Sequence, residues 1–128
     1  MQDDKNFLEG ERIRRQLVGE PEKALMPGRL AKWLDEFRDM EITHVWGTYW
    51  TRTDLLDMRS RAIVSLTCLV SLGYDEELLP FIEGLIRNKI LTKIEIREVI
   101  MQCPGYLGYP KTLGARKCAQ LAFSNKEL

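Results

Sequence analysis

The sequence lacks long apolar runs, a net charge and an apolar N-terminal segment. Its longest apolar runs, such as residues 62–72, fall far short of the ~20 residues that a membrane-spanning helix needs. The N-terminal segment alternates acidic and basic residues, which is not the pattern of a signal peptide. Lys plus Arg and Asp plus Glu both number 19, whereas nucleic-acid-binding proteins usually carry a basic excess. We therefore expect no membrane span and no nucleic-acid partner.

Histidine and cysteine are also scarce, which argues against metal and thiol chemistry. The chain has one histidine, His44, which cannot form a metal cluster alone. Its three cysteines, Cys68, Cys103 and Cys118, are widely spaced and form no CxxC pair. An odd number of separated cysteines suits reduced thiols in the cytosol. The sequence thus predicts a cytoplasmic protein with no bound metal.

The residues that are present suffice for one domain. The 128 residues are 45% hydrophobic and 30% charged, which is enough to fill a core and cover a surface without metal or disulfide staples. We expect a single domain over residues 1–128. The net charge of zero also promotes association between copies of the chain.

Apolar residues recur at helical spacing along nearly the whole chain, and we predict an all-α bundle of about six helices. A first helix carrying Ile13 and Leu17 should end at Gly19, a common C-cap residue. One or two helices should follow over residues 25–37, interrupted at Pro27-Gly28. Residues 42–49 are rich in β-branched and aromatic side chains and could form a strand. Because no partner strand is in view, we interpret them as helical.

Capping signals define the helices of the second half. The helix that ends at Gly73 has an apolar face at i, i+3, i+4 and i+7 spacing. Thr92 and Glu95 form a capping box, which predicts a helix start. The other expected boundaries are a start near Asp54 or Asp57, an N-cap at Asp75, a stop at Pro104-Gly105 and a last start at Pro110.

Three segments, taken in order, carry a resemblance to a known family. Residues 46–61 read WGTYWTRTDLLDMRSR and resemble the pattern W-G-x-x-W-x-R-x-x-L-D-x-R-x-R. An apolar helix then closes on LGYDEEL at residues 72–78. Residues 88–110 hold E-I-R-E-V followed by Y-L-G-Y-P. In this order, over residues 10–123, the segments resemble the carboxymuconolactone decarboxylase family.

The resemblance implies an all-α fold that assembles as trimers or hexamers, with pockets at or near subunit contacts. The redox branch of the family carries a CxxC with a following histidine, and residues 74–81 of this chain contain no cysteine. The decarboxylase branch is the closer one. It implies a lyase that removes CO₂ from a carboxylated butenolide, and because the substrate's own carbonyl accepts the electrons, no cofactor is implied.

Two positions depart from the family pattern. The family commonly has a glutamate in W-G-E-x-W and a histidine in the helix after the glycine turn, where this chain has Thr48 and Phe81. Neither replacement titrates near neutral pH. A changed substrate, a changed reaction and a lost reaction are therefore all open alternatives.

Arginines are the candidates for binding a substrate carboxylate, because a guanidinium grips a carboxylate bidentately. Arg52 is the first candidate and Arg59 the second, although Arg59 and Arg61 could instead pair with acidic residues. For proton transfer we single out His44, the one side chain that titrates near neutrality, and Tyr106, whose phenol could donate to a developing oxyanion. A half-exposed His44 without a role is the simpler alternative.

The remaining candidates for substrate contact are Trp46, Trp50, Glu98 and Gln102. The two tryptophans share a helix face and could wall a ring-shaped ligand, although such aromatics are more often core. Glu98 and Gln102 share a face of their own helix and could point into the same pocket or bridge subunits. Nothing in the sequence near Cys103 would clearly lower its pKa, so we expect an inert buried thiol.

Three functions therefore compete. The first is a cofactor-free lyase or isomerase acting on a small carboxylated ring compound. The second is a pocket protein without chemistry, either a binder or a subunit that stabilises another assembly. The third is thiol-dependent peroxide reduction by Cys103 or Cys118 acting alone. The retained Trp-Arg motif and the Y-x-G-x-P turn favour the first function, whereas Thr48 and Phe81 favour the second.

Overall fold

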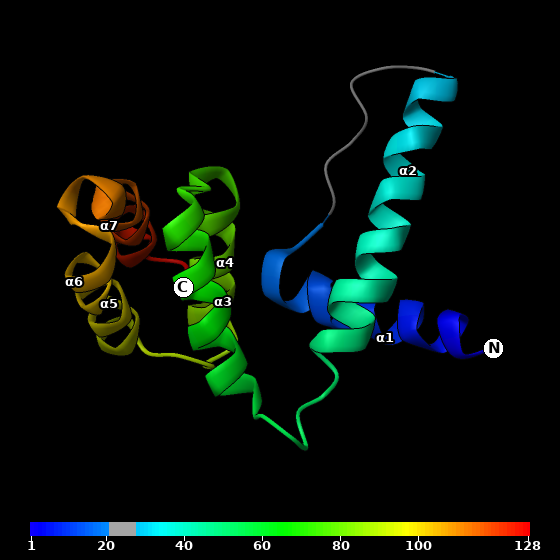
Figure 1. Ribbon diagram of the computed structural model, residues 1–128, viewed down its shortest axis with the longest axis horizontal. Coiled ribbons are helices and arrows are strands. Elements are labelled where there is room, and N and C mark those ends of the chain that lie inside the picture. The colour runs from blue at the N-terminus through cyan, green and yellow to red at the C-terminus, as the bar shows by residue number, and fades with distance from the viewer. Residues whose placement is uncertain (21–27) are drawn as a thin grey trace. The chain divides into compact units, whose positions relative to one another are not determined.

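The computed structural model describes residues 1–20 and 28–128, and every regular element in them is a helix (Figure 1). No strand occurs in these residues, so the predicted all-α class is confirmed. The described chain forms two compact units, Met1–Leu56 and Asp57–Leu128. A single domain over residues 1–128 stays a prediction. None of the helices in the described parts of the chain has the length and apolarity needed to cross a membrane.

The N-terminal unit consists of three helical segments: α1 (Gln2–Val18), α2 (Arg29–Glu41) and the π-helix η1 (Ile42–Tyr49). As predicted, α1 ends at Gly19, which has a φ of 80°. The interruption expected at Pro27-Gly28 falls partly outside the described residues, since Pro27 is not among them. From Gly28 onward, α2 runs directly into η1. The helical interpretation of residues 42–49 is confirmed, and its π form was not foreseen.

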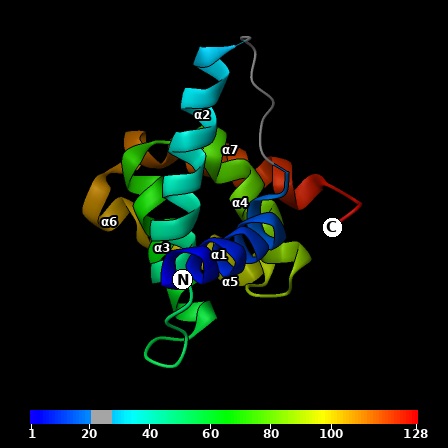
Figure 2. The same ribbon diagram turned by 90° about the vertical axis from the view of Figure 1, so that its right-hand side faces the viewer.

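Two glycines let α1 and η1 touch backbone to backbone. Both views show α1 crossing the C-terminal end of α2, where η1 follows (Figures 1 and 2). Gly10 of α1 and Gly47 of η1 are buried at this crossing. A Cβ added to Gly47 would overlap the backbone of Asn6, and a Cβ on Gly10 would overlap the backbone of Ile42. The glycine of the Trp-Gly motif therefore has a packing role.

The C-terminal unit consists of five helices around one core. They are α3 (Met58–Leu72), α4 (Asp75–Arg87), α5 (Lys93–Gln102), the short α6 (Pro104–Leu107) and α7 (Tyr109–Ser124). α4 packs on α3 and α7, and α5 packs on α3 and α7 (Figure 1). The largest fully buried side chains of the C-terminal unit are Leu66, Val70, Leu78, Ile82, Leu85, Leu91 and Ile96. Small buried residues on α7, such as Ala115 and Ala122, allow its close approach to α4.

Most of the predicted capping signals of the C-terminal unit are confirmed. The carboxylate of Asp57 accepts a 2.7 Å hydrogen bond from the Ser60 backbone N–H, and Gly73 ends α3 in the left-handed conformation. The capping box of Thr92 and Glu95 starts α5 with both reciprocal hydrogen bonds in place. These signals are local, so the sequence alone was enough to place them.

One boundary prediction, the N-cap at Asp75, is wrong. Asp75 is the first residue of α4, and Tyr74 is the N-cap without a side-chain cap. The Asp75 carboxylate lies instead against Gly114 of α7, where a Cβ would collide with it. The stop at Pro104-Gly105 is confirmed, since α5 ends at Gln102 and Pro104 opens the short α6. The start at Pro110 is confirmed to within one residue, because α7 begins at Tyr109 with the proline in its first turn. Proline fits the first turn of a helix, since it lacks only an N–H that would be unpaired there.

We predict that Gly47→Ala destabilises the N-terminal unit, because the added methyl group has no space between η1 and α1. The expected loss is about 1–3 kcal/mol, the usual cost of overpacking. All three tryptophans of the chain, Trp33, Trp46 and Trp50, lie in this unit, so tryptophan fluorescence during urea unfolding reports on it. Gly105→Ala is the matched control, because nothing lies within 4 Å of its added Cβ. Equal unfolding midpoints for the two variants would contradict the packing role.

Candidate functional site

A cavity of about 550 Å³ lies between α3, α5 and α6, wholly within the C-terminal unit. Its volume is in the range of pockets that hold small organic ligands. One wall comes from α3, the facing wall from α5 and one end from α6. The lining residues are Arg59, Ile63, Thr67, Ser71, Ile94, Glu95, Glu98, Val99, Gln102, Cys103, Tyr106 and Leu107.

The α3 wall is a single helical stripe. Arg59, Ile63, Thr67 and Ser71 follow one another at intervals of four, which places them on one face of the helix. The Thr67 hydroxyl donates to the Ile63 carbonyl at 2.8 Å, and the Ser71 hydroxyl donates to the Thr67 carbonyl at 2.8 Å. Both hydroxyl hydrogens are thus used inside the helix. A ligand would meet these two oxygens as acceptors only.

The cation of this pocket is already paired. Arg59, in the first turn of α3, donates from Nη2 to Oε2 of Glu95, in the first turn of α5. The other carboxylate oxygen of Glu95 accepts from the Thr92 backbone N–H at 3.0 Å as part of the capping box. The Glu95 carboxylate therefore links the starts of α3 and α5 across the pocket.

A second acidic group of the pocket is also paired. The Nη2 and Nε atoms of Arg97 donate to Oε1 of Glu98 at 2.8 and 3.0 Å. The two arginines and two glutamates cancel one another's formal charge. The pocket is thus apolar at its walls and close to neutral at its rim.

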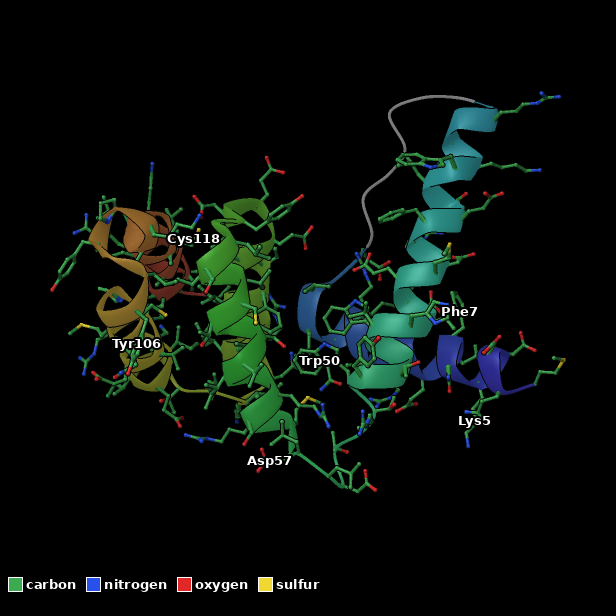
Figure 3. All side chains as sticks on the ribbon, in the orientation of Figure 1. Lys5, Phe7, Trp50, Asp57, Tyr106 and Cys118 are labelled. Carbon is green, nitrogen blue, oxygen red and sulfur yellow. The ribbon has the colours of Figure 1, made fainter. Side chains whose placement is uncertain are left out.

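Tyr106 and Gln102 complete the predicted residues of the pocket. Tyr106, labelled in Figure 3, lies on α6 and lines the cavity while being 85% exposed. Gln102 is the last residue of α5 and is exposed. Tyr106 lies in α6 and Tyr109 opens α7, on either side of the non-helical Gly108 of the Y-x-G-x-P segment. Half of the predicted site residues, Arg59, Glu98, Gln102 and Tyr106, line this one pocket.

The other half of the predicted site residues belongs to the N-terminal unit. Trp46 and Trp50 are buried, and their rings stack with centroids 5.3 Å apart and an interplanar angle of 14°. The Trp46 indole N–H donates to Glu41 Oε1 at 3.3 Å. Burial and stacking within the unit favour the core interpretation of these two residues. His44 and Arg52 are both exposed on the same unit.

The two departures from the family pattern have different surroundings. The Thr48 hydroxyl donates to the Thr43 carbonyl at 3.0 Å, five residues back along η1. Phe81 is 3% exposed and lies in the core of the C-terminal unit, on the buried face of α4. Neither side chain can exchange a proton near neutral pH.

Sequence reasoning missed three polar residues of the pocket, Glu95, Thr67 and Ser71. Glu95 was identified only as a capping residue, which is correct but accounts for one of its two carboxylate oxygens. The stripe at intervals of four from Arg59 to Ser71 was available in the sequence as a signal. It went unnoticed because polar residues on one side of an amphipathic helix usually face solvent.

The three cysteines differ in exposure, and this decides their reactivity. Burial raises the pKa of the Cys103 thiol, which donates to the Val99 carbonyl at 3.3 Å. Burial, assisted by the negative charge of Asp75, raises the pKa of the Cys118 thiol. Cys68 is exposed. Since the thiolate is the reactive form, the two buried cysteines are poor nucleophiles.

No group of three His, Cys, Asp or Glu side chains that could hold a metal ion occurs within residues 1–20 and 28–128. The polar groups of the pocket are suited to an organic ligand: one guanidinium, two carboxylates, one amide, one phenol, two hydroxyls and one thiol.

We predict that the native protein reacts with one equivalent of a thiol reagent at pH 7–8 in the fast phase, at Cys68. Cys103 and Cys118 should react much more slowly, because their raised pKa values and burial suppress the thiolate. The release of thionitrobenzoate from Ellman's reagent measures this, with the denatured chain giving three equivalents. Cys68→Ser should remove the fast phase. A fast phase of two or three equivalents in the native protein would refute the assignment.

Comparison with known proteins gives one informative similarity. No protein-family model matches the chain, and no solved structure matches it. A curated protein named 4-carboxymuconolactone decarboxylase, from Acinetobacter baylyi (strain ATCC 33305 / BD413 / ADP1), is 26% identical over 125 residues. The alignment covers 98% of this chain and 92% of that protein. The resemblance seen in three segments of the sequence is therefore matched by a similarity to this one protein over nearly the whole chain.

Proposed function

We propose that the protein is a cofactor-free carbon–carbon lyase that decarboxylates a small carboxylated lactone or a related ring compound. The observation that carries this proposal is the cavity between α3, α5 and α6, which is lined by Arg59, Glu98, Gln102 and Tyr106. The relationship to a protein named for this type of reaction supports it.

The proposed reaction asks for three things from the protein. The bond between the carboxylate carbon and the ring carbon breaks, CO₂ leaves, and the electron pair moves into the conjugated carbonyl. The resulting dienolate then takes a proton at carbon. The protein has to hold the substrate's carboxylate, stabilise the negative oxygen and supply the proton.

The candidate residues divide among these roles. Arg52 and Arg59 are the proposed anchors for carboxylate groups, because a guanidinium binds a carboxylate through two hydrogen bonds. Tyr106 and His44 are the proposed proton donors, and the Tyr106 phenol also suits the developing oxyanion. The apolar side chains of Ile63, Val99 and Leu107 on the pocket walls would keep water from the bound ring.

A second function is favoured by a specific observation. The family positions for glutamate and histidine hold Thr48 and Phe81, whose surroundings are a helix carbonyl and an apolar core. A protein without chemistry, which binds a small carboxylated compound in the same pocket, needs neither proton donor. Turnover is the measurement that separates the two functions.

Assembly and location belong to the same proposal. We propose a homo-oligomer, a trimer or a hexamer, that works in the cytoplasm on a small carboxylated compound. The C-terminal unit has exposed large apolar side chains on two of its helices, which a subunit contact would remove from water. Examples are Ile94 and Met101 on α5 and Leu113 and Leu121 on α7.

We predict that the purified protein releases CO₂ from 4-carboxymuconolactone above the rate without enzyme, and that Arg52→Ala lowers kcat/KM by roughly 30-fold or more. That factor corresponds to about 2 kcal/mol, the lower end of the cost of removing one partner of a charge pair. Arg12→Ala is the matched control: Arg12 is an exposed arginine of the same unit that pairs with Glu9. Normal turnover by Arg52→Ala would remove Arg52 from the site, and no turnover by the folded wild type would favour the binding function.

We predict that the double variant Thr48→Glu, Phe81→His has more decarboxylase activity than the wild type, because it restores both titratable groups of the family pattern. The imidazole at position 81 would be buried, so the variant should also be less stable, and the assay needs a temperature well below its Tm. A folded double variant with no gain in CO₂ release would show that these two positions do not by themselves account for a diverted reaction.

A further inference from the structure

The guanidinium of Arg59, which a ligand's carboxylate would bind, already forms an ion pair with Glu95. Among the described residues that line the cavity, Arg59 supplies the guanidinium, and its Nη2 is bound to Glu95. The side chains of Arg59 and Glu95 are 55% and 32% exposed. A carboxylate that enters the pocket therefore meets a cation that already has a partner at the rim.

The two partners of this ion pair are held very differently. Glu95 is fixed at the start of α5, because its Oε1 accepts from the Thr92 backbone N–H while the Thr92 hydroxyl accepts from the Glu95 backbone N–H. Arg59 has a long side chain that is more than half exposed. Arg59 can leave Glu95 without breaking the capping box. If Arg59 moves from Glu95 to a ligand's carboxylate, the ion pair is lost but the start of α5 stays intact.

The surroundings of the pair favour such an exchange. Ion pairs in contact with water contribute little to stability, since water competes for both charges. A ligand carboxylate whose ring covers the apolar pocket walls would hold Arg59 in a less polar environment, where the same pairing is stronger. A neutral ligand of the same shape gains nothing from Arg59. The affinity of the pocket for a charged ligand would therefore depend on how strongly Glu95 competes for Arg59.

We propose that Glu95 is a specificity-determining residue: it competes with the ligand's carboxylate for Arg59 and so sets how strongly the pocket prefers carboxylated over neutral ring compounds. The inference rests on the proposed function only in taking a small carboxylated ring compound as the ligand. It does not require that the protein catalyse a reaction. Glu98 has no equivalent role, because its carboxylate is paired with Arg97 beside it on α5.

The test is Glu95→Gln, with 2-furoate and its neutral counterpart 2-furamide as probes. The glutamine carbonyl still accepts from the Thr92 backbone N–H, as capping boxes with glutamine do, but it no longer carries a charge opposite Arg59. We expect 2-furoate to bind about three- to fivefold more tightly than to the wild type and 2-furamide to bind with unchanged affinity. Titrations followed by amide chemical shifts at pH 7 and low salt give both dissociation constants. Glu77→Gln, which removes one negative charge from the exposed first turn of α4, should change neither.

Arg59→Gln provides the second arm. It should remove the preference for 2-furoate, and the double variant Arg59→Gln, Glu95→Gln should behave like Arg59→Gln alone, because the two residues act through one contact. The ratio of the two affinities is measured within each variant, so a general loss of stability does not imitate the effect. A thermal melt of each variant confirms that it is folded at the titration temperature.

Each outcome is decisive. An unchanged furoate-to-furamide ratio in Glu95→Gln would overturn the proposal, and so would a wild type and Glu95→Gln that both fail to bind 2-furoate. Binding of 2-furoate with the expected shift, together with no CO₂ release from 4-carboxymuconolactone, would instead overturn the lyase function and leave the role of Glu95 in place.

Discussion

The carboxylate of Glu95 joins the starts of two helices of the C-terminal unit. One oxygen closes the capping box that starts α5, and the other meets Arg59 at the start of α3. Farther along, Leu66 of α3 and Ile96 of α5 are fully buried, so the two helices are also joined through the core. The cavity is lined by both of these helices and by α6. The shape of the cavity therefore depends on where α5 begins, and the hydrogen bond from the Thr92 backbone N–H to the Glu95 carboxylate fixes that start.

Local signals predicted the fold well, and signals that depend on distant contacts did not. Asp57, Gly73 and the Thr92 capping box were readable because each acts within one turn of its own helix. The π form of η1 was not predicted from the sequence, and its contact with α1 through Gly47 joins residues that are distant along the chain. Asp75 was misplaced for a similar reason: a good N-cap residue is used here against Gly114, thirty-nine positions along the chain.

The candidate site, like the fold, was predicted from the sequence only in part. Arg59, Glu98, Gln102 and Tyr106 came from the family resemblance, and the structure gathers them around one cavity. Ile63 and Thr67 belong to no motif, and their spacing of four from Arg59 shows that they share its helix face but does not show that this face lines a cavity. Phe81 shows the opposite case, where a position expected to hold a titratable group is part of the apolar core. Its aromatic ring fills space that an imidazole would have to enter without a charge.

The contact between Gly10 and Gly47 is a constraint on the fold that does not depend on the chemistry of the protein. Two helix backbones that touch directly tolerate no side chain at either position, whatever reaction the protein performs. The neighbouring tryptophans stack on each other in the same buried unit. The Trp-Gly pair is therefore required by the packing of the N-terminal unit, and a substitution at Gly47 would disturb that unit before it affected the cavity of the C-terminal unit.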